Sequence, residues 1–236
     1  MTEYFVSGGN SGLAQGLISI LSKTENVQYF ARTKNHKLSK KVKYNRVDFS
    51  KAFKDADLKF KISNNTKEIV FFNNSAILGS MNNFSETNPK EITEVFSINF
   101  LSPIIIINKL IKISQKLDIK LTVVNITSGL TEYPVSHLTN YIVSKKAMMF
   151  FLKVLNLDIQ NNSFYSLSID PGMLNTDMQL KLRLSNISSS GFFIKKFNDN
   201  MLRDVNQVSN SIYSFLKQKK WKNEEIYHIN EIEKLI

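Results

Sequence analysis

Short apolar runs rich in β-branched and aromatic residues alternate along the chain with longer segments in which apolar residues recur every three to four positions. The short runs have the length and composition of buried strands, and the longer segments have the period of helices. The strands are predicted at residues 4–7, 27–31, 44–48, 69–73, 121–126, 164–169 and 226–229, and the helices include residues 13–22, 89–117, 140–156 and 205–219. This alternation predicts an α/β fold with a doubly wound parallel sheet of about seven strands.

The chain of 236 residues is interpreted as one Rossmann-fold domain spanning residues 1–236. Its length would also permit two small domains. However, no low-complexity linker divides the chain, and no repeat occurs beyond the strand and helix rhythm. Residues 173–204 depart from that rhythm, because Phe and Met are scattered there among Ser, Asn and Lys. We predict a substrate loop or lid in this segment.

Charge and composition narrow the possible functions. The net charge of +11 could attract nucleic acid or anionic lipid, but the lysines are scattered and no RNA-binding or zinc-finger motif occurs, so no nucleic-acid partner is expected. With no cysteine, the chain has neither a disulfide framework nor a thiolate metal site. The three histidines, His36, His137 and His228, show no metal-ligand spacing. No metal is expected.

The most apolar stretch, residues 98–113, is interrupted by polar and charged side chains well short of a membrane-spanning run. It is predicted to be a buried helix, and no membrane association is expected. The first residues lack the basic and long apolar regions of a cleaved signal peptide. The expected location is therefore cytoplasmic.

A glycine-rich turn joins the first predicted strand to the first predicted helix. Its sequence is Ser7-Gly8-Gly9-Asn10-Ser11-Gly12-Leu13-Ala14. Glycines let the chain turn tightly and let backbone N–H groups approach a pyrophosphate at the positive end of the helix. Glycine-rich turns often only reverse the chain and bind no ligand. The position of this turn after the first strand nevertheless predicts a dinucleotide site. The residues expected to form it are Ser7, Gly8, Asn10, Ser11, Gly12 and Leu13.

Arg32 follows the second predicted strand, where the ribose of a dinucleotide would lie. A guanidinium there suits a 2′-phosphate, whereas an acidic residue would suit a free 2′-hydroxyl. The residue favours NADP(H) over NAD(H), and the alternative is an exposed arginine with no ligand. Two further loops follow strands at the same edge, and they contain the cofactor candidates Asp48, Phe49, Asn73, Asn74 and Ser75.

Tyr141 and Lys145 are four residues apart, so a helix places them on one face. A cation near a phenol favours the phenolate and lowers the pKa of the tyrosine toward working pH, as a proton donor and acceptor requires. This spacing is common by chance. Ser128 strengthens the interpretation, because a hydroxyl at the end of the preceding strand could hold a substrate carbonyl oxygen beside the phenol.

At these positions the sequence resembles the short-chain dehydrogenases/reductases, over nearly the whole chain and in the same order. On the cofactor side, residues 7–14 match the family's T-G-x-x-x-G-x-G motif, Asp48 matches its adenine-side aspartate, and Asn73-Asn74-Ser75-Ala76 match its N-N-A-G motif. Asn99 matches the family's helix asparagine, and Ser128, Tyr141 and Lys145 match its catalytic serine, tyrosine and lysine. Pro171-Gly172-Met173-Leu174-Asn175-Thr176 match its P-G-x-x-x-T motif. The resemblance implies a four-residue catalytic set, and contacts of Pro171, Gly172, Leu174 and Thr176 with the nicotinamide end of the cofactor.

The departures from the family pattern replace one small residue by another. Ala14 stands for the third glycine, Ser7 for a threonine, and Ser75-Ala76 for Ala-Gly, which bears on affinity more than on chemistry. Ser11 stands where several NADP-preferring relatives have a second basic residue, so the NADP(H) prediction rests mainly on Arg32. Residues 125–129 and 171–179 are most similar to the sepiapterin reductase and benzil reductase branch, whose members reduce vicinal dicarbonyls and similar ketones with NADPH.

The resemblance implies that hydride passes from NADPH to a ketone carbon while Tyr141 gives its proton to the carbonyl oxygen. Ser128 holds that oxygen, Lys145 lowers the pKa of Tyr141 and binds the ribose, and Asn99 supports a water that restores the proton. Asn99 could instead cap an irregular backbone. Five residues could line the substrate pocket or simply belong to the core: Leu130, Tyr133, Met173, Met178 and Phe193.

Three functions remain open. The first is reduction of a ketone or vicinal dicarbonyl, and the second is oxidation or reduction of a sugar or acyl intermediate in a biosynthetic pathway. The third is a regulatory module that binds the cofactor without turnover, although none of the catalytic residues is lost. Family members usually assemble through long helices, here residues 89–117 and 140–156, so a homodimer or homotetramer is expected.

Overall fold

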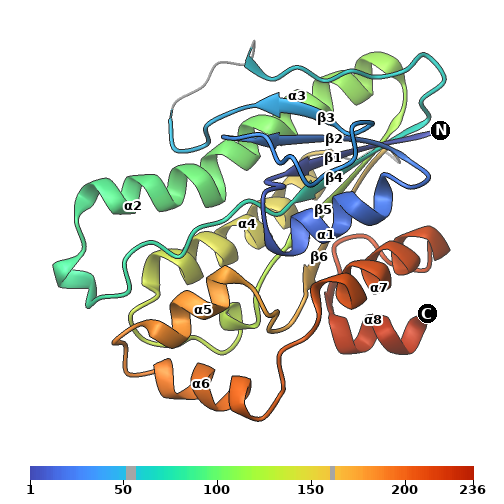
Figure 1. Cartoon of the computed structure of the whole chain (residues 1–236). Coiled ribbons are helices and arrows are strands. Elements are labelled where there is room, and N and C mark those ends of the chain that lie inside the picture. Colours follow the sequence, from blue (N-terminus) through green and yellow to red (C-terminus); the bar gives the residue numbers. More distant parts are fainter. Residues whose placement is uncertain (52–56, 160–162) are drawn as a thin grey trace.

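A computed structural model describes residues 1–51, 57–159 and 163–236, and within them seven strands form one parallel sheet in the order β3-β2-β1-β4-β5-β6-β7 (Figure 1). The predicted fold class is confirmed. The strands are β1 (Thr2–Ser7), β2 (Asn26–Ala31), β3 (Lys43–Arg46), β4 (Glu68–Asn73), β5 (Lys120–Ile126), β6 (Phe164–Asp170) and β7 (Ile226–His228). Each lies within two residues of its predicted bounds.

The strand order reverses beside β1. The chain runs from β1 to β2 and β3 on one side and then returns to β4 on the other side. In an open parallel sheet, the loops that leave the carboxyl ends of the strands separate at such a point and leave a crevice for a ligand. The glycine-rich turn follows β1 at this reversal.

Helices cover both faces of the sheet (Figure 1). Those of the described residues are α1 (Gly12–Leu21), α2 (Pro89–Phe96), α3 (Ser102–Leu117), α4 (Thr139–Asp158), α5 (Asp177–Leu184), α6 (Ser190–Asn198), α7 (Val205–Gln218) and α8 (Ile229–Leu235). Figure 1 shows α1, α7 and α8 on one side of the strands and α3 and α4 on the other. Short 3-10 turns occur at Phe84–Glu86 and Gly129–Thr131.

Alternate residues of each central strand enter different cores, because successive side chains of a strand point to opposite faces. In β4, Val70 and Phe72 pack in the core that includes α1, α7 and α8, whereas Ile69 and Phe71 pack in the core that includes α3 and α4. Strands buried on both faces are almost continuously apolar, which is the pattern seen in the sequence.

The predicted helix at residues 89–117 is interrupted. A π-helical segment, η3 (Ser97–Leu101), lies between α2 and α3. By length and composition, Pro89–Leu117 could cross a membrane, and 39% of its most apolar window is buried. In the fold, Ile106, Ile107 and Leu110 are fully buried in the core beneath the sheet. This is the arrangement of a core helix.

The predicted loop at residues 173–204 contains two short helices, α5 and α6, at the carboxyl edge of the sheet (Figure 1). Leu182, Ile187 and Phe193 are buried there in a third apolar cluster that also contains Tyr141. The segment therefore covers one side of the predicted catalytic tyrosine. That it acts as a lid remains a prediction.

Candidate active site

A cavity of about 1220 Å³ opens at the carboxyl ends of the strands. It is larger than the usual 300–1,000 Å³ of a site for one small ligand, so a dinucleotide and a substrate could share it. Most of the predicted site residues line this cavity. They are Gly8, Asn10, Ser11, Gly12, Leu13, Arg32, Asp48, Phe49, Asn74, Ser75, Ser128, Leu130, Tyr133, Tyr141, Lys145, Pro171, Gly172, Met173, Leu174, Thr176, Met178 and Phe193.

The glycine-rich turn has the backbone shape that a close approach to a ligand requires. Gly8, Gly9 and Gly12 have φ of 85°, 147° and 56°, which L side chains rarely adopt. A Cβ on Gly9 would lie 2.5 Å from Cδ2 of Tyr29. The helix α1 begins at Gly12, and neither a side-chain cap from Ser11 nor an acidic residue occurs in its first turn. Its N-terminus thus fits an anionic group such as a pyrophosphate.

Ser7 and Asn73 do not line the cavity, unlike the other predicted cofactor residues. Both are buried, Ser7 beneath the glycine-rich turn and Asn73 at the end of β4. The Ser7 hydroxyl oxygen accepts hydrogen bonds from the backbone N–H groups of Asn74 (2.9 Å) and Ser75 (3.0 Å). Asn73 donates to Oδ1 of Asn125 at 3.0 Å. These two residues hold the cofactor loops in place.

The expected ribose end of the cavity contains Arg32 and Asp48. Arg32 is exposed and follows β2 directly. Asn10 of the glycine-rich turn donates to the hydroxyl of Thr33 at 2.6 Å, which joins the two loops. The Asp48 carboxylate accepts from the backbone and hydroxyl of Ser50, and these bonds, chiefly the hydroxyl one, lower the pKa of Asp48, with a smaller contribution from the charge of Arg32.

The predicted chemical residues meet at the other end of the cavity. Ser128 follows β5, and Tyr141 and Lys145 lie on α4. The Ser128 oxygen accepts the backbone N–H of Leu130 at 3.3 Å, and the Ser128 hydroxyl acts to lower the pKa of the Tyr141 phenol. The serine proton is therefore free to point toward the phenol oxygen. A substrate carbonyl oxygen placed between the two hydroxyls would meet two donors.

The pKa of Tyr141 differs from the sequence-based expectation. Burial raises it to about 12, the charge of Asp170 adds to the increase, and the hydrogen bond from Ser128 opposes it. Lys145 is buried as well, so its own pKa is lowered to about 8. Its ammonium donates to the backbone oxygen of Ile126 at 2.7 Å. Burial thus dominates the pKa of Tyr141, and the lowering that we expected from a nearby cation is not seen.

Asn99 lies in the π-helical segment behind the cavity and is buried. Its side-chain oxygen accepts from the N–H of Ile77 at 2.9 Å, and its amide donates to the oxygen of Ile77 at 2.9 Å and to the Ser144 hydroxyl at 3.0 Å. Both amide hydrogens are thus used to tie α4 to the loop after β4. The Asn99 side chain therefore has a structural use in the described chain, and its role in holding a water stays a prediction.

The five predicted substrate-pocket residues all line the cavity, but their burial differs. Phe193 is only 2% exposed and packs in the cluster around Tyr141, whereas Tyr133 is 81% exposed. Leu130, Met173 and Met178 are partly buried against the same cluster. Apolar side chains thus surround the phenol on the side of α5 and α6, which suits an apolar substrate.

A carboxylate and an imidazole that the sequence did not single out as site residues also lie side by side at the cavity. Asp170 and His228 end the adjacent strands β6 and β7 in register, and their Oδ2 and Nε2 atoms are 3.7 Å apart. The other carboxylate oxygen of Asp170 accepts the N–H of Gly172 at 3.0 Å. A Cβ on Gly129 would lie 2.9 Å from Oδ2 of Asp170. The Asp170 carboxylate therefore lies directly behind the loop that contains Ser128 and Gly129. The pairing of the last two strands was the signal that could have placed Asp170 and His228 together.

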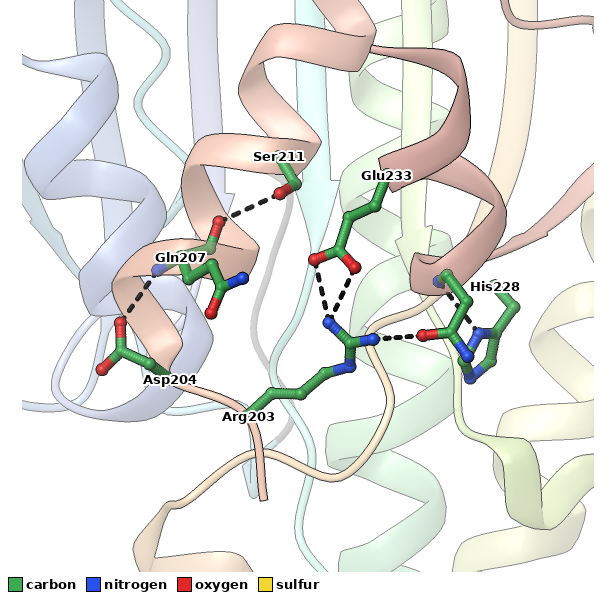
Figure 2. A network of polar contacts seen from close by, with 7 residues as sticks. Arg203, Asp204, Gln207, Ser211, His228 and Glu233 are labelled. Atoms are coloured by element: carbon green, nitrogen blue, oxygen red, sulfur yellow. Dashed lines mark hydrogen bonds and ion pairs between the residues drawn. The ribbon is translucent and has the colours of Figure 1, made fainter. Parts of the chain in front are cut away.

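The C-terminal helix stabilises the segment after Asp170. His228 caps α8 by accepting the N–H of Asn230 at 3.1 Å. Arg203 pairs with Glu233 of α8 at 2.8 Å and donates to the side chain of Asn230 (Figure 2). The backbone of Arg203 in turn bonds to Met173 (2.8 Å) and Asn175 (3.1 Å). Arg203 thus links residues 171–176 to the C-terminal helix α8.

The sheet order, the glycine-rich turn and the serine, tyrosine and lysine in one cavity define an oxidoreductase that acts on C=O and CH–OH groups with a nicotinamide cofactor. The model of the short chain dehydrogenase family matches residues 9–186. The chain therefore belongs to this family.

Two kinds of similarity extend over nearly the whole chain. A benzil reductase ((S)-benzoin forming) of Bacillus subtilis is 25% identical over 245 residues, covering 98% of this chain and 99% of that protein. A short chain dehydrogenase/reductase structure from Saccharomyces cerevisiae has a TM-score of 0.79 at 18% identity, and the match covers 98% of this chain and 96% of that chain. A 3-ketoacyl-(acyl-carrier-protein) reductase from Brucella melitensis, complexed with NADH, has a TM-score of 0.75 at 16% identity, covering 96% of both chains. These two structures establish the fold.

Proposed function

We propose that this protein uses NADPH to reduce a ketone, with vicinal dicarbonyls as the substrate class, and that Tyr141 donates the proton. The observation that carries the proposal is the state of Tyr141: a buried phenol beside Ser128, with a pKa of about 12, holds its proton at neutral pH. A protonated phenol is the proton donor that reduction of a carbonyl requires. The similarity to benzil reductase over the full length supports the substrate class.

The bound cofactor supplies a hydride to the carbonyl carbon. Ser128 donates a hydrogen bond to the carbonyl oxygen and keeps it beside Tyr141. As negative charge develops on that oxygen, Tyr141 transfers its proton to it, so the product is an alcohol and the tyrosine is left as phenolate. Lys145, whose pKa of about 8 leaves it charged at neutral pH, stabilises the phenolate from one helical turn away until a proton returns from solvent.

Arg32 supports the choice of NADPH. It is exposed at the cavity directly after β2, where the ribose of a dinucleotide binds in this fold. A guanidinium there pairs with a 2′-phosphate, whereas a free 2′-hydroxyl is usually held by a carboxylate. Asp48, the nearest acidic candidate, follows β3 and is engaged with Ser50.

The test follows NADPH absorbance while the purified protein is offered vicinal diketones, quinones and pterin-like ketones. Tyr141→Phe is the control variant, and NADPH binding to both proteins is measured by fluorescence. We expect the wild type to consume NADPH, and the variant to bind NADPH normally but to lose turnover by a factor of about 10² to 10⁴. Unchanged turnover in Tyr141→Phe would refute the role of the tyrosine. Absence of turnover with every ketone, in a wild-type protein that binds NADPH, would refute the substrate class.

A further inference from the structure

The outward side of α5 and α6 exposes several large apolar side chains. Leu184 is 75% exposed and lies one helical turn from Leu180, and Ile194 lies one turn from Phe197. The exposed apolar residues of these two helices and the turn after α6 are Leu180, Leu184, Phe192, Ile194, Phe197 and Met201. A single exposed apolar residue is normal, whereas a contiguous group marks a surface that binds something.

Side-chain contacts join these residues into one patch. The helices α5 and α6 pack against each other (Figure 1). The guanidinium of Arg183 on α5 lies 3.8 Å from the centre of the Phe197 ring on α6. The Lys196 ammonium lies 5.6 Å from the centre of the Phe192 ring and 3.4 Å from Sδ of Met201. The apolar side chains of the two helices therefore form a continuous surface with cations placed among them.

The charge of this surface is positive. Its basic residues are Lys181, Arg183, Lys195 and Lys196, and none of them forms an ion pair with another described residue. Two acidic residues are nearby, Asp177 at the start of α5 and Asp199 just after the end of α6. We refer to the six apolar and four basic residues together as the α5–α6 surface.

The composition of the α5–α6 surface favours a lipid partner. A second copy of the chain fits poorly, because a twofold contact would place the same cations opposite one another. Protein interfaces are enriched in Tyr, Trp and Arg and depleted in Lys, whereas this surface has three lysines and neither Tyr nor Trp. On an anionic bilayer, Leu, Ile and Phe side chains enter the boundary of the acyl chains, and the lysine ammonium groups reach the lipid phosphates.

We propose that the α5–α6 surface docks the protein on an anionic lipid bilayer. From the sequence we expected no membrane association, because the most apolar stretch is interrupted by polar side chains. A surface that lies on a bilayer needs no spanning stretch, and the net charge of +11 draws the protein to anionic lipid. Phe192 also lines the active-site cavity, so docking by this surface brings the mouth of the cavity to the lipid. The proposal does not depend on which reaction the protein catalyses.

The test measures co-sedimentation of the purified protein with two kinds of vesicle. One is pure phosphatidylcholine, and in the other about one third of the lipid is phosphatidylglycerol. We expect binding to the anionic vesicles only, and weaker binding at high salt. Leu184→Gln/Ile194→Gln and Lys181→Gln/Lys195→Gln should each lower the partition constant by at least about tenfold, because each lost side chain contributes a factor of about five.

Two double variants are matched controls. Leu235→Gln/Ile236→Gln also replaces one exposed leucine and one exposed isoleucine, but at α8. Lys23→Gln/Lys67→Gln removes two exposed charges at the amino-terminal edge of the sheet, opposite to α5 and α6. Both controls should bind anionic vesicles as the wild type does. A loss in the controls equal to that in the α5–α6 variants would overturn the proposal, because the whole-chain charge or general apolarity would then explain the binding.

A fluorescent label reports which side of the protein meets the lipid. The chain has no cysteine, so Leu184→Cys and Leu235→Cys each create a unique site for a polarity-sensitive fluorophore. We expect anionic vesicles to shift the emission of the label to the blue in Leu184→Cys and not in Leu235→Cys. Vesicle binding without this shift in Leu184→Cys would overturn the proposal. Absence of binding to the anionic vesicles would overturn it in favour of an acidic protein partner.

Melting temperatures separate docking from folding. All the substituted side chains are exposed, so the Tm of each variant should equal that of the wild type. If Leu184→Gln/Ile194→Gln nevertheless has a lower Tm, the lysine pair and the label still decide the outcome. Vesicle binding that is unchanged in Lys181→Gln/Lys195→Gln would refute the docking of these cations on lipid phosphates.

Discussion

Removing the charge of Asp170 should lower the pKa of Tyr141 and thereby speed proton transfer at neutral pH. Burial raises the pKa of Tyr141 to about 12, and the charge of Asp170 adds to this increase. At pH 7 about one Tyr141 in 10⁵ is then phenolate. Alcohol oxidation needs the phenolate as proton acceptor, whereas ketone reduction needs the phenol, which nearly every molecule already has.

In Asp170→Asn, the pKa of Tyr141 should fall from about 12 but stay above 10.0, because burial of the phenol remains. Each unit of decrease raises the phenolate population tenfold at neutral pH, so oxidation of the alcohol product should increase by up to about a hundredfold. Reduction at subsaturating substrate should increase by the same factor, because a more acidic phenol is a better proton donor and the equilibrium constant fixes the ratio of kcat/KM in the two directions. The asparagine oxygen can still accept the N–H of Gly172, so the turn after β6 keeps its hydrogen bond.

The assay measures initial rates of alcohol oxidation with NADP⁺ and of ketone reduction with NADPH between pH 6 and pH 8 for the wild type and Asp170→Asn. His228→Asn is the matched control, since asparagine also caps helices and the Asp170 charge is retained. We expect His228→Asn to oxidise no faster than the wild type. An oxidation rate in Asp170→Asn equal to or below that of the wild type, with unchanged affinity for NADP⁺, would contradict the assigned role of the carboxylate.

Three other predictions concern cofactor choice, packing and assembly. Arg32→Ala should lower kcat/KM for NADPH by about 10- to 100-fold and leave that for NADH nearly unchanged, as measured by steady-state kinetics with both cofactors. Gly16→Ala should lower the free energy of unfolding in urea by about 1–2 kcal/mol, because its Cβ would overlap Oγ of Ser209. Gly191→Ala, whose Cβ would have nothing within 4 Å, should raise the free energy of unfolding by up to about 1 kcal/mol. Light scattering should show a dimer or tetramer that Phe150→Lys dissociates, since Phe150 is an apolar residue of α4 that is 67% exposed; a wild-type monomer would contradict this.

The strands and the catalytic residues were predictable from the sequence because local patterns determine them. A strand buried on both faces, such as β4 with Val70 and Phe71 in opposite cores, must be apolar throughout, and that run is visible without any tertiary information. Tyr141 and Lys145 are brought together by one helical turn, so their spacing alone places them. The glycine-rich turn is likewise encoded by the residue type that its positive φ values require.

Features that depend on contacts between distant segments were not predictable in this way. The π-helical break in Pro89–Leu117 accompanies hydrogen bonds from Asn99 to Ile77 and Ser144, which are 22 and 45 residues away in sequence. Ser7 and Asn73 match cofactor motifs, yet their side chains serve the loops beneath the site. A motif records which residue type is needed at a position, and it does not say whether the ligand or a neighbouring loop needs it.

Asp170 and Gln179 show why the chemical details required the fold. An isolated carboxylate or carboxamide is a common surface residue, and neither position carries a periodic or spacing signal. The fold sets their surroundings, because both residues line the cavity. Asp170 is partly buried and lies next to His228 at the ends of two strands, and the Gln179 carboxamide has no hydrogen-bond partner among the described residues. Buried polar groups in a binding cavity are destabilising unless a ligand or a functional charge uses them. Asp170 is therefore the position at which the proton transfer of Tyr141 is best tested.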